Sequence, residues 1–317
     1  MPTYGYTLMS ELHDPRSLVM QAQRAEDHGF EFVVSSDHYH PWLASHDHSP
    51  FAWSVLGAVA DRTNSIGIAS MVTCPIVRYH PAIVAQAAAT VAVMSNGRFT
   101  LGLGSGENLN EHVVGRGWPP VAERHEMLRE AVEVIRELWS GDRVDYDGEH
   151  VQVRNARLYD IPLHEPDMFM GVSGDASVEL AVNLGLGICA TEPDAALVDA
   201  FHTVVGESDR TWGQVAISWD EDADKAAHLA WERFRFSVLG WPTNTELESV
   251  EDFEDATKDV SVEQVSDVVP CGADPERVAE ALRRYTDAGY EHVAVLPLGD
   301  NPDELLHAWQ DRIRPLL

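Results

Sequence analysis

The chain has 317 residues, 44% of them hydrophobic, which is enough apolar material for a large buried core. Its formal net charge is −30, with 22 lysine and arginine residues against 52 aspartate and glutamate residues. A surface of this sign repels a phosphate backbone, so nucleic-acid binding is disfavoured. No apolar stretch reaches bilayer length and the start has no signal-peptide pattern. We therefore expect a cytoplasmic protein with a small-molecule substrate and no membrane partner.

The acidic residues outnumber the lysines to an unusual degree, because only Lys225 and Lys258 are present. A hydrated, acid-rich surface is typical of halophilic proteins, whose self-repulsion is screened at high ionic strength. An acidic protein of an ordinary organism is the alternative. The three cysteines, Cys74, Cys189 and Cys271, have no disulfide or metal spacing, so we expect buried thiols.

Apolar runs of strand length alternate with amphipathic helical stretches along nearly the whole chain. The expected strands are Thr3–Leu8, Phe30–Ser36, Ile66–Val72, Phe99–Ser105, Asp167–Ser173, Gly185–Thr191, Trp212–Trp219 and His292–Leu298. The expected helices include Ser17–His28, Ala82–Met94, Ala122–Trp139, Ala223–Arg235, Pro275–Ala288 and Asp303–Ile313. Eight strands, each followed by a helix, predict an α/β fold: a single (β/α)₈ TIM barrel that spans residues 1–317. A doubly wound sheet would need fewer strands and a phosphate fingerprint after the first.

Three insertions follow strand ends, at residues 37–53, 106–120 and 238–272. In a TIM barrel such insertions are loops at the catalytic face, where the chemistry is built. Residues 143–158 predict a β-hairpin that turns at Asp147-Gly148.

The first insertion opens with Asp37-His38, which the second strand aims into the mouth of the barrel. A histidine there can exchange a proton near neutral pH, and a neighbouring carboxylate would hold its tautomer. Trp42 offers an aromatic wall and one N–H donor to a flat ligand. The alternative is a loop whose histidine and tryptophan merely cap the strand.

Four histidines, His38, His40, His46 and His48, lie within eleven residues and raise the possibility of a metal site. A metal hydrolase of this fold would need further ligands at other strand ends. Strands four to six end instead in Ser105, Ser173 and Thr191. We therefore expect no metal, and expect His46 and His48 to be solvated.

The fourth strand leads into Gly102-Leu-Gly104-Ser-Gly106-Glu107. This spacing is a poor dinucleotide fingerprint. The glycines would let a planar ligand approach the backbone, and would place Glu107 at the mouth opposite His38. The alternative is a tight turn with Glu107 as a helix cap. After the fifth strand, Ser173-Gly174 opens a helix whose free N–H groups could hold a phosphate, although Asp175 would oppose it if it faced inward.

These segments together resemble the F420-dependent branch of the bacterial-luciferase-like superfamily, whose members include F420-dependent glucose-6-phosphate dehydrogenases and alcohol dehydrogenases. The matching segments are Ser36–Trp42, Arg78–Gln86, Gly104–Glu111 and Leu138–Gly141, with Val262–Val265 as a looser match.

The resemblance implies a deazaflavin, coenzyme F420, bound in the mouth of the barrel. It implies that His38 and Trp42 face the substrate carbinol, that Glu107 lies near a ring nitrogen, and that Glu11 is a further pocket acid. It also implies a non-prolyl cis peptide at Met71–Val72. The residues expected to contact the cofactor are Asp37, Met71, Val72, Thr73, Gly106, Glu107, Asn110, Ser173 and Gly174.

The substrate is expected to be a neutral alcohol or sugar. The regions that grip the sugar phosphate in the glucose-6-phosphate enzymes correspond to Ala190–Asp194, Pro242–Thr245 and Ser266–Val268, and none of these carries a lysine or arginine. Arg235 could restore positive charge, or could be a surface helix arginine. We thus expect an F420-dependent oxidoreductase that transfers hydride, and the resemblance implies a homodimer. The alternatives are an FMN-dependent monooxygenase or reductase, an F420-dependent glucose-6-phosphate dehydrogenase, and a non-catalytic flavin-binding protein.

Overall fold

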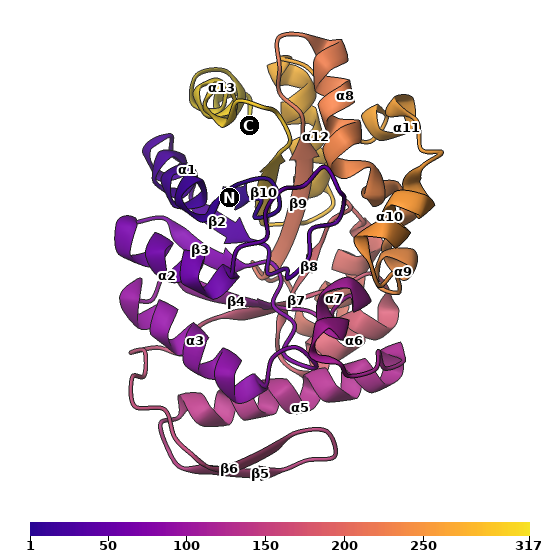
Figure 1. Cartoon of the computed structure of the whole chain (residues 1–317). Coiled ribbons are helices and arrows are strands. Elements are labelled where there is room, and N and C mark those ends of the chain that lie inside the picture. Colours follow the sequence, from indigo (N-terminus) through magenta and orange to yellow (C-terminus); the bar gives the residue numbers. More distant parts are fainter.

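Eight parallel strands close into a barrel in the order β1-β10-β9-β8-β7-β4-β3-β2 in the computed structural model, which describes residues 1–317 (Figure 1). The strands are β1 (Thr3–Leu8), β2 (Phe32–Ser35), β3 (Gly67–Ser70), β4 (Phe99–Leu103), β7 (Met168–Gly171), β8 (Gly187–Ala190), β9 (Thr211–Ile217) and β10 (His292–Pro297). Each overlaps one expected strand, and β1 has the expected bounds. The predicted TIM barrel is confirmed.

Helices surround the barrel and connect its strands (Figure 1). They are α1 (Pro15–Asp27), α2 (Ala52–Arg62), α3 (Pro81–Met94), α5 (Val121–Trp139), α6 (Asp175–Asn183), α7 (Ala195–Val205), α8 (Ala223–Phe234), α12 (Pro275–Asp287) and α13 (Pro302–Ala308). The helix predicted at the C-terminus ends its α-helical part at Ala308 and continues as a π-helical turn, Trp309–Ile313. None of the helices combines the length and the apolar composition that crossing a membrane would require.

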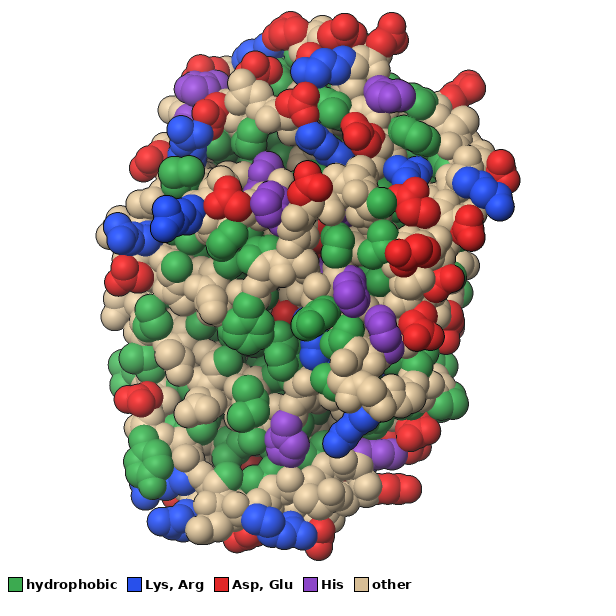
Figure 2. All heavy atoms as spheres, viewed as in Figure 1, with side chains coloured by type: hydrophobic (Ala, Val, Ile, Leu, Met, Phe, Trp, Pro, Cys, Tyr) green, Lys and Arg blue, Asp and Glu red, His purple; other side chains and the backbone are tan.

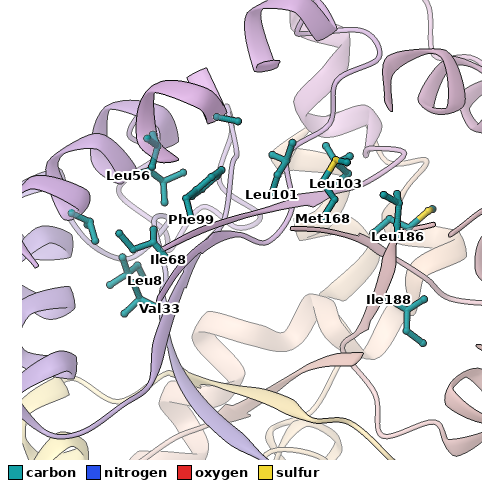
Figure 3. Close-up of a cluster of buried hydrophobic side chains, with 14 of the residues drawn as sticks. Leu8, Val33, Leu56, Ile68, Phe99, Leu101, Leu103, Met168, Leu186 and Ile188 are labelled. Carbon is teal, nitrogen blue, oxygen red and sulfur yellow. The ribbon is translucent and has the colours of Figure 1, made fainter. Parts of the chain in front are cut away.

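The core is divided into two layers by the wall of the barrel. Outward-pointing side chains such as Leu8, Val33 and Ile68 pack against the helices, where they meet Leu56 of α2 (Figure 3). Inward-pointing rings fill the barrel: Phe32 and Phe169 lie 4.9 and 4.7 Å from Trp212 between ring centroids. The strands are therefore apolar on both faces, and this explains why they stand out in the sequence as continuous apolar runs.

The predicted hairpin is present as β5 (Val144–Asp147) and β6 (Gln152–Ala156), on the outer side of α5 (Figure 1). Its connection is not a two-residue Asp-Gly turn but the four residues Gly148–Val151, closed by a 2.9 Å bond from Gly148 N to Val151 O. The carboxylate of Glu130 on α5 accepts three of the loop's backbone N–H groups, at 2.8–2.9 Å. The conformation of this loop therefore depends on Glu130 of α5, which lies outside the hairpin and which a local turn motif cannot reveal.

The insertion at residues 238–272, here named the cap, is not an open loop as expected. It folds into the short helices α9 (Trp241–Asn244), α10 (Val250–Thr257) and α11 (Val262–Ser266). Ser249 and Ser261 begin the last two, each with a capping box to the residue three positions on. Residues 106–120 contain α4 (Asn108–Glu111) and one 3₁₀ turn.

Candidate active site

The predicted site residues on the first four barrel strands lie on loops at the carboxyl ends of those strands. This is the face where TIM barrels carry their chemistry. Glu11 follows β1, Asp37 and His38 follow β2, the segment 71–73 follows β3, and Glu107 follows β4.

Glu11 and His38 form a buried pair. The Nδ1 atom of His38 lies 2.5 Å from Oε1 of Glu11, and the side chains are 10% and 3% exposed. The hydroxyl of Ser36 donates to Oε2 of Glu11 at 3.0 Å, and that of Ser10 does so at 3.3 Å. Burial alone would raise the pKa of Glu11, but the adjacent imidazole outweighs burial and lowers the pKa below its usual range. Burial alone would lower the pKa of His38, but the Glu11 carboxylate raises it.

The other ring nitrogen of His38 has no hydrogen-bond partner in the protein. The ring meets Trp42 edge to face at 4.9 Å, and Trp42 is held in turn by a parallel stack on Phe236 at 4.7 Å. The indole N–H of Trp42 also donates to no protein group. The two rings are therefore held in place by Glu11 and Phe236, with one polar atom of each left free for a ligand.

Asp37 faces the opposite way from its neighbour His38 and has no exposed side-chain surface. Its Oδ2 accepts from Thr73 Oγ1 at 2.8 Å, and its Oδ1 accepts from Tyr79 at 3.0 Å and from Arg78 at 3.1 Å. Arg78 donates also to the Asp37 backbone carbonyl at 2.7 Å. A ligand can contact this carboxylate only if one of these donors moves away.

A second buried acid, Glu111, lies on the other side of Arg78. Its Oε2 accepts the backbone N–H of Arg78 at 2.7 Å, and its Oε1 lies 3.5 Å from the guanidinium Nε. Burial raises the pKa of Glu111 to about 7, because these contacts with Arg78 only partly offset the loss of water. Sequence reasoning did not select Arg78, Tyr79 or Glu111 as site residues, although each occurs in a segment that carries the family resemblance.

Glu107 is half-buried at the start of α4, and its side chain makes no capping hydrogen bond. Glu107 therefore occupies the N-cap position of α4, but its side chain does not cap the helix. Its negative charge contributes to the raised pKa of His38, after burial and the larger effect of Glu11. The carboxylate of Glu107 therefore lies close enough to His38 to affect its charge.

The glycines before Glu107 make room for the β3 loop rather than leaving open space. A Cβ atom on Gly104 would lie 2.6 Å from Val72 Cγ2, and one on Gly106 would lie 2.5 Å from Cys74 Sγ. Gly106 also has a φ of +80°, which favours glycine. These glycines therefore pack closely against the β3 loop, and the left-handed backbone of Gly106 allows the chain to turn there. The expected cis peptide at Met71–Val72 is confirmed.

Three further residues, Asn110, Ser173 and Gly174, are expected to contact the cofactor, and the protein already uses some of their polar atoms. The Asn110 side-chain oxygen accepts from Tyr39 N and His40 N at 2.8 and 3.0 Å, while its buried Nδ2 has no partner. The backbone N–H groups of Ser173 and Gly174 donate to Ser177 Oγ at 3.1 and 3.2 Å. At the start of α6 the hydroxyl of Ser177 therefore already occupies the two predicted phosphate donors.

Two side chains differ from expectation because the cap and α8 cover them. His46 is buried rather than solvated, with Nε2 2.9 Å from the Arg233 carbonyl. Arg235 is neither a surface arginine nor a free positive charge, since it is buried and pairs with Glu254 at 2.6 Å. No cluster of three or more His, Cys, Asp or Glu side chains could hold a metal ion.

The chain is similar along almost its whole length to known oxidoreductases. It is 33% identical to the F420-dependent glucose-6-phosphate dehydrogenase of Microbacterium testaceum (strain StLB037), over 99% of this chain and 97% of the relative. It is 34% identical to the protein of the same name from Mycobacterium avium (strain 104), again over 99% and 97%.

Among solved structures, an F420-dependent secondary alcohol dehydrogenase in complex with an F420-acetone adduct superposes with a TM-score of 0.91. The two are 27% identical, and the match covers 100% of this chain and 99% of that one. The family description luciferase-like monooxygenase matches residues 3–292. The chain therefore belongs to the luciferase-like monooxygenase family.

Proposed function

We propose that this protein is a coenzyme F420-dependent oxidoreductase that transfers hydride between a carbinol substrate, an alcohol or a sugar, and the deazaflavin. The observation that carries the proposal is His38, whose Nδ1 is held by the buried Glu11 and whose Nε2 is unpartnered beside Trp42. The relatives described above, each F420-dependent by name, support the choice of cofactor. We propose residues 1–317 as one domain.

The residues at the mouth fit such a cofactor. The buried Asn110 Nδ2 has no hydrogen-bond partner, and the Glu107 side chain makes no capping bond. We propose that His38 Nε2 and the Trp42 indole N–H face the ligand, because Glu11 contacts His38 through Nδ1 and the two rings meet edge to face. A Cβ atom on Gly174 would face open space, so the start of α6 can be approached closely. The residues proposed to hold the cofactor remain Asp37, Met71, Val72, Thr73, Gly106, Glu107, Asn110, Ser173 and Gly174. Asp37 would act mainly by shaping the site, because protein donors surround its carboxylate.

The proposed mechanism assigns one task to each of four residues. Bound F420 would supply the acceptor for the hydride of the carbinol carbon. His38 Nε2 takes the hydroxyl proton, and Glu11 stabilises the imidazolium that results. Trp42 directs its N–H at the substrate oxygen. Glu107 accepts or returns a proton on the opposite side of the mouth. In the reverse direction, protonated His38 donates to the carbonyl oxygen.

A neutral substrate is favoured over a sugar phosphate. After β8, Thr191 accepts a 2.8 Å hydrogen bond from the Trp241 indole in the cap, and neither residue is charged. Arg124 and Arg235, the buried arginines that contact the cap, pair with Glu246 at 2.9 Å and with Glu254 at 2.6 Å. A phosphate dianion would have to compete with these carboxylates for its counter-charge. Phosphate recognition would therefore differ from the pattern expected for the glucose-6-phosphate enzymes.

We propose that the protein forms a homodimer through the outer face of α2 and α3. Helix α3 has fourteen residues and none is charged, in a protein whose net charge is −30. Phe51, Ile83 and Met94 on this face are 55%, 57% and 42% exposed, and grooves of about 530 Å³ flank α2 on both sides. Hydrophobic side chains gather over α2 and α3 in Figure 2, whereas acidic ones are frequent over α8 and the cap. A second copy would cover this face without bringing the acidic surfaces together.

The acidic surface supports two further proposals about the surroundings of the protein. The charge of −30 with only two lysines supports adaptation to high salt, where screening weakens self-repulsion. Three buried, unpaired cysteines support the reducing conditions of the cytoplasm.

The test is turnover with F420 on a panel of neutral secondary alcohols, sugars and glucose 6-phosphate. We expect the neutral carbinols to have the higher kcat/KM, and Glu107→Gln to lose at least about tenfold in kcat. Glu123→Gln, an exposed acid at the start of α5, is the matched control and should keep wild-type kcat. A preference for glucose 6-phosphate would contradict the substrate assignment. Unaltered turnover in Glu107→Gln would contradict the role of that residue.

A further inference from the structure

The side chain of Arg78 lies between two buried carboxylates that come from different loops. Its guanidinium donates to the carboxylate and the carbonyl of Asp37, on the β2 loop, and approaches Glu111, on α4. Its own backbone N–H donates to Glu111, which fixes the β3 loop to α4 a second time. The guanidinium lies 4.5 Å from the Tyr79 ring centroid. The Arg78 side chain is only 7% exposed, so water has little access to these contacts.

Both carboxylates that Arg78 contacts lie close in the chain to a proposed site residue. Asp37 directly precedes His38 in the chain. Glu111 lies four residues beyond Glu107, one turn along α4. The contacts of Arg78 with Asp37 and Glu111, here named the clamp, therefore join the β2 loop, which carries His38, to α4, which begins after Glu107. Thr73, which also donates to Asp37, is the residue after the cis peptide.

We propose that Arg78 is a positioning residue whose guanidinium sets the placement of His38 relative to Glu11 and Glu107 across the mouth. The proposal rests on the proposed function only for its kinetic consequence. The planar guanidinium hydrogen-bonds to Asp37 through Nη2 and at the same time keeps Nε 3.5 Å from Glu111 as an ion pair. A lysine ammonium keeps the charge but cannot span both acids. Arg78→Lys therefore separates the geometry of the clamp from its charge.

The experiment is an NMR titration of the His38 ring in the cofactor-free protein, with the signal assigned by its absence from His38→Gln. The titratable and charged groups that act on His38 are Glu11, Glu107, Arg78 and the buried His46. The charge of Arg78 is retained in Arg78→Lys, so its direct effect is preserved. If the β2 loop loosens, Glu11 holds the imidazolium less well, and the pKa of His38 falls. We also expect kcat with F420 to fall by roughly a hundredfold, as for a misplaced reacting group, with a smaller change in KM.

Arg98→Lys is the matched control. Arg98 makes five hydrogen bonds to backbone and hydroxyl oxygens at the opposite end of the barrel, before β3 and β4. Its loss should lower Tm but leave the pKa of His38 and kcat unchanged. A merely structural role for Arg78 would give the same result as this control, and would overturn the proposal.

Should Arg78→Lys fail to fold, the triple variant Asp37→Asn, Arg78→Met, Glu111→Gln removes the buried charges together and serves in its place. Loss of the Arg78 charge alone would raise the pKa of His38, so a fall in this variant reports the loosened β2 loop. A folded triple variant in which the pKa of His38 does not fall would overturn the proposal. The titration needs no cofactor, so a wild-type protein that fails to turn over F420 would contradict the proposed function and leave this test intact.

Discussion

Asp37 and His38 are neighbours in the chain, yet they belong to networks of opposite character. His38 has one strong partner, Glu11, and one ring nitrogen that the protein leaves unpartnered. Asp37 accepts from Thr73, Arg78 and Tyr79, and no part of its side chain is exposed. The first network can still exchange a proton with a ligand, whereas the second has every bond made within the protein. Two polar residues at one strand end can thus serve chemistry and scaffold separately.

The two buried glutamates extend this comparison. Glu11 stays ionised because the imidazole at 2.5 Å outweighs its burial. Glu111 has a cation nearby too, but Arg78 is shared with Asp37 and its Nε lies 3.5 Å away, so the pKa rises to about 7. Two carboxylates of similar burial therefore have pKa values shifted in opposite directions. The shift depends on how near the cationic partner lies and on whether a second carboxylate shares that partner.

The largest expected effect is the loss of the unpartnered nitrogen. His38→Ala should lower kcat by roughly a hundred- to ten-thousand-fold, because the hydroxyl proton would have no acceptor at the mouth. Steady-state turnover with F420 and a secondary alcohol measures the change. His112→Gln, a half-exposed histidine stacked on His40, is the control and should keep wild-type kcat. Equal rates in the two variants would remove His38 from the mechanism.

The next effect is a pH-dependent loss of stability that comes from Glu111, the buried acid beside Arg78. The pKa of Glu111 is about 7 in the folded protein against an ordinary value of 4.5. Its contribution to the free energy of unfolding is therefore complete below pH 4.5 and is lost as the pH rises through 7. The loss should be on the order of 3 kcal/mol.

Chemical denaturation of wild type and Glu111→Gln across this range measures that contribution. Glutamine mimics the protonated carboxyl, so the two proteins should have similar unfolding free energies at low pH, and wild type should become less stable than the variant as the pH rises through 7. A difference that does not vary with pH would mean that Glu111 is ionised throughout, like Glu11.

A smaller effect is expected on the pH profile of the first network. Glu11→Gln removes the carboxylate that raises the pKa of His38, so the histidine should become neutral at a lower pH. In the proposed mechanism, oxidation of the alcohol requires neutral His38, and kcat/KM should therefore rise at lower pH in the variant than in wild type. The loss in kcat itself should be about tenfold. An unshifted profile would place the titrating group elsewhere.

The barrel could be predicted from the sequence because its strands are buried on both faces. Thr3–Leu8 and the seven later apolar runs need no tertiary contact to be recognised. The site residues His38, Trp42 and Glu107 could also be placed at the mouth, since each follows a strand end. The fold of the cap was harder to predict because its helices are short. The capping-box residues Ser249 and Ser261 are nevertheless sequence signals for the start of a helix.

Pairing between loops could not be predicted. Nothing local shows that Arg78 and Tyr79, before α3, turn back to Asp37 some forty positions earlier. His46 looks solvated in the sequence because the segments that bury it, including Phe236, lie nearly two hundred positions away. These contacts between distant loops form only when the barrel closes, and the hydrophobic pattern of the sequence does not predict them.

The central claim is that the mouth beside His38 binds and uses a deazaflavin. A titration of the purified protein with F420 and with FMN, followed by addition of a secondary alcohol, tests it most directly. We predict at least about tenfold tighter binding of F420, followed by bleaching of its visible absorbance when the alcohol is added. Tighter binding of FMN, with no reduction of F420 by any carbinol, would contradict the account.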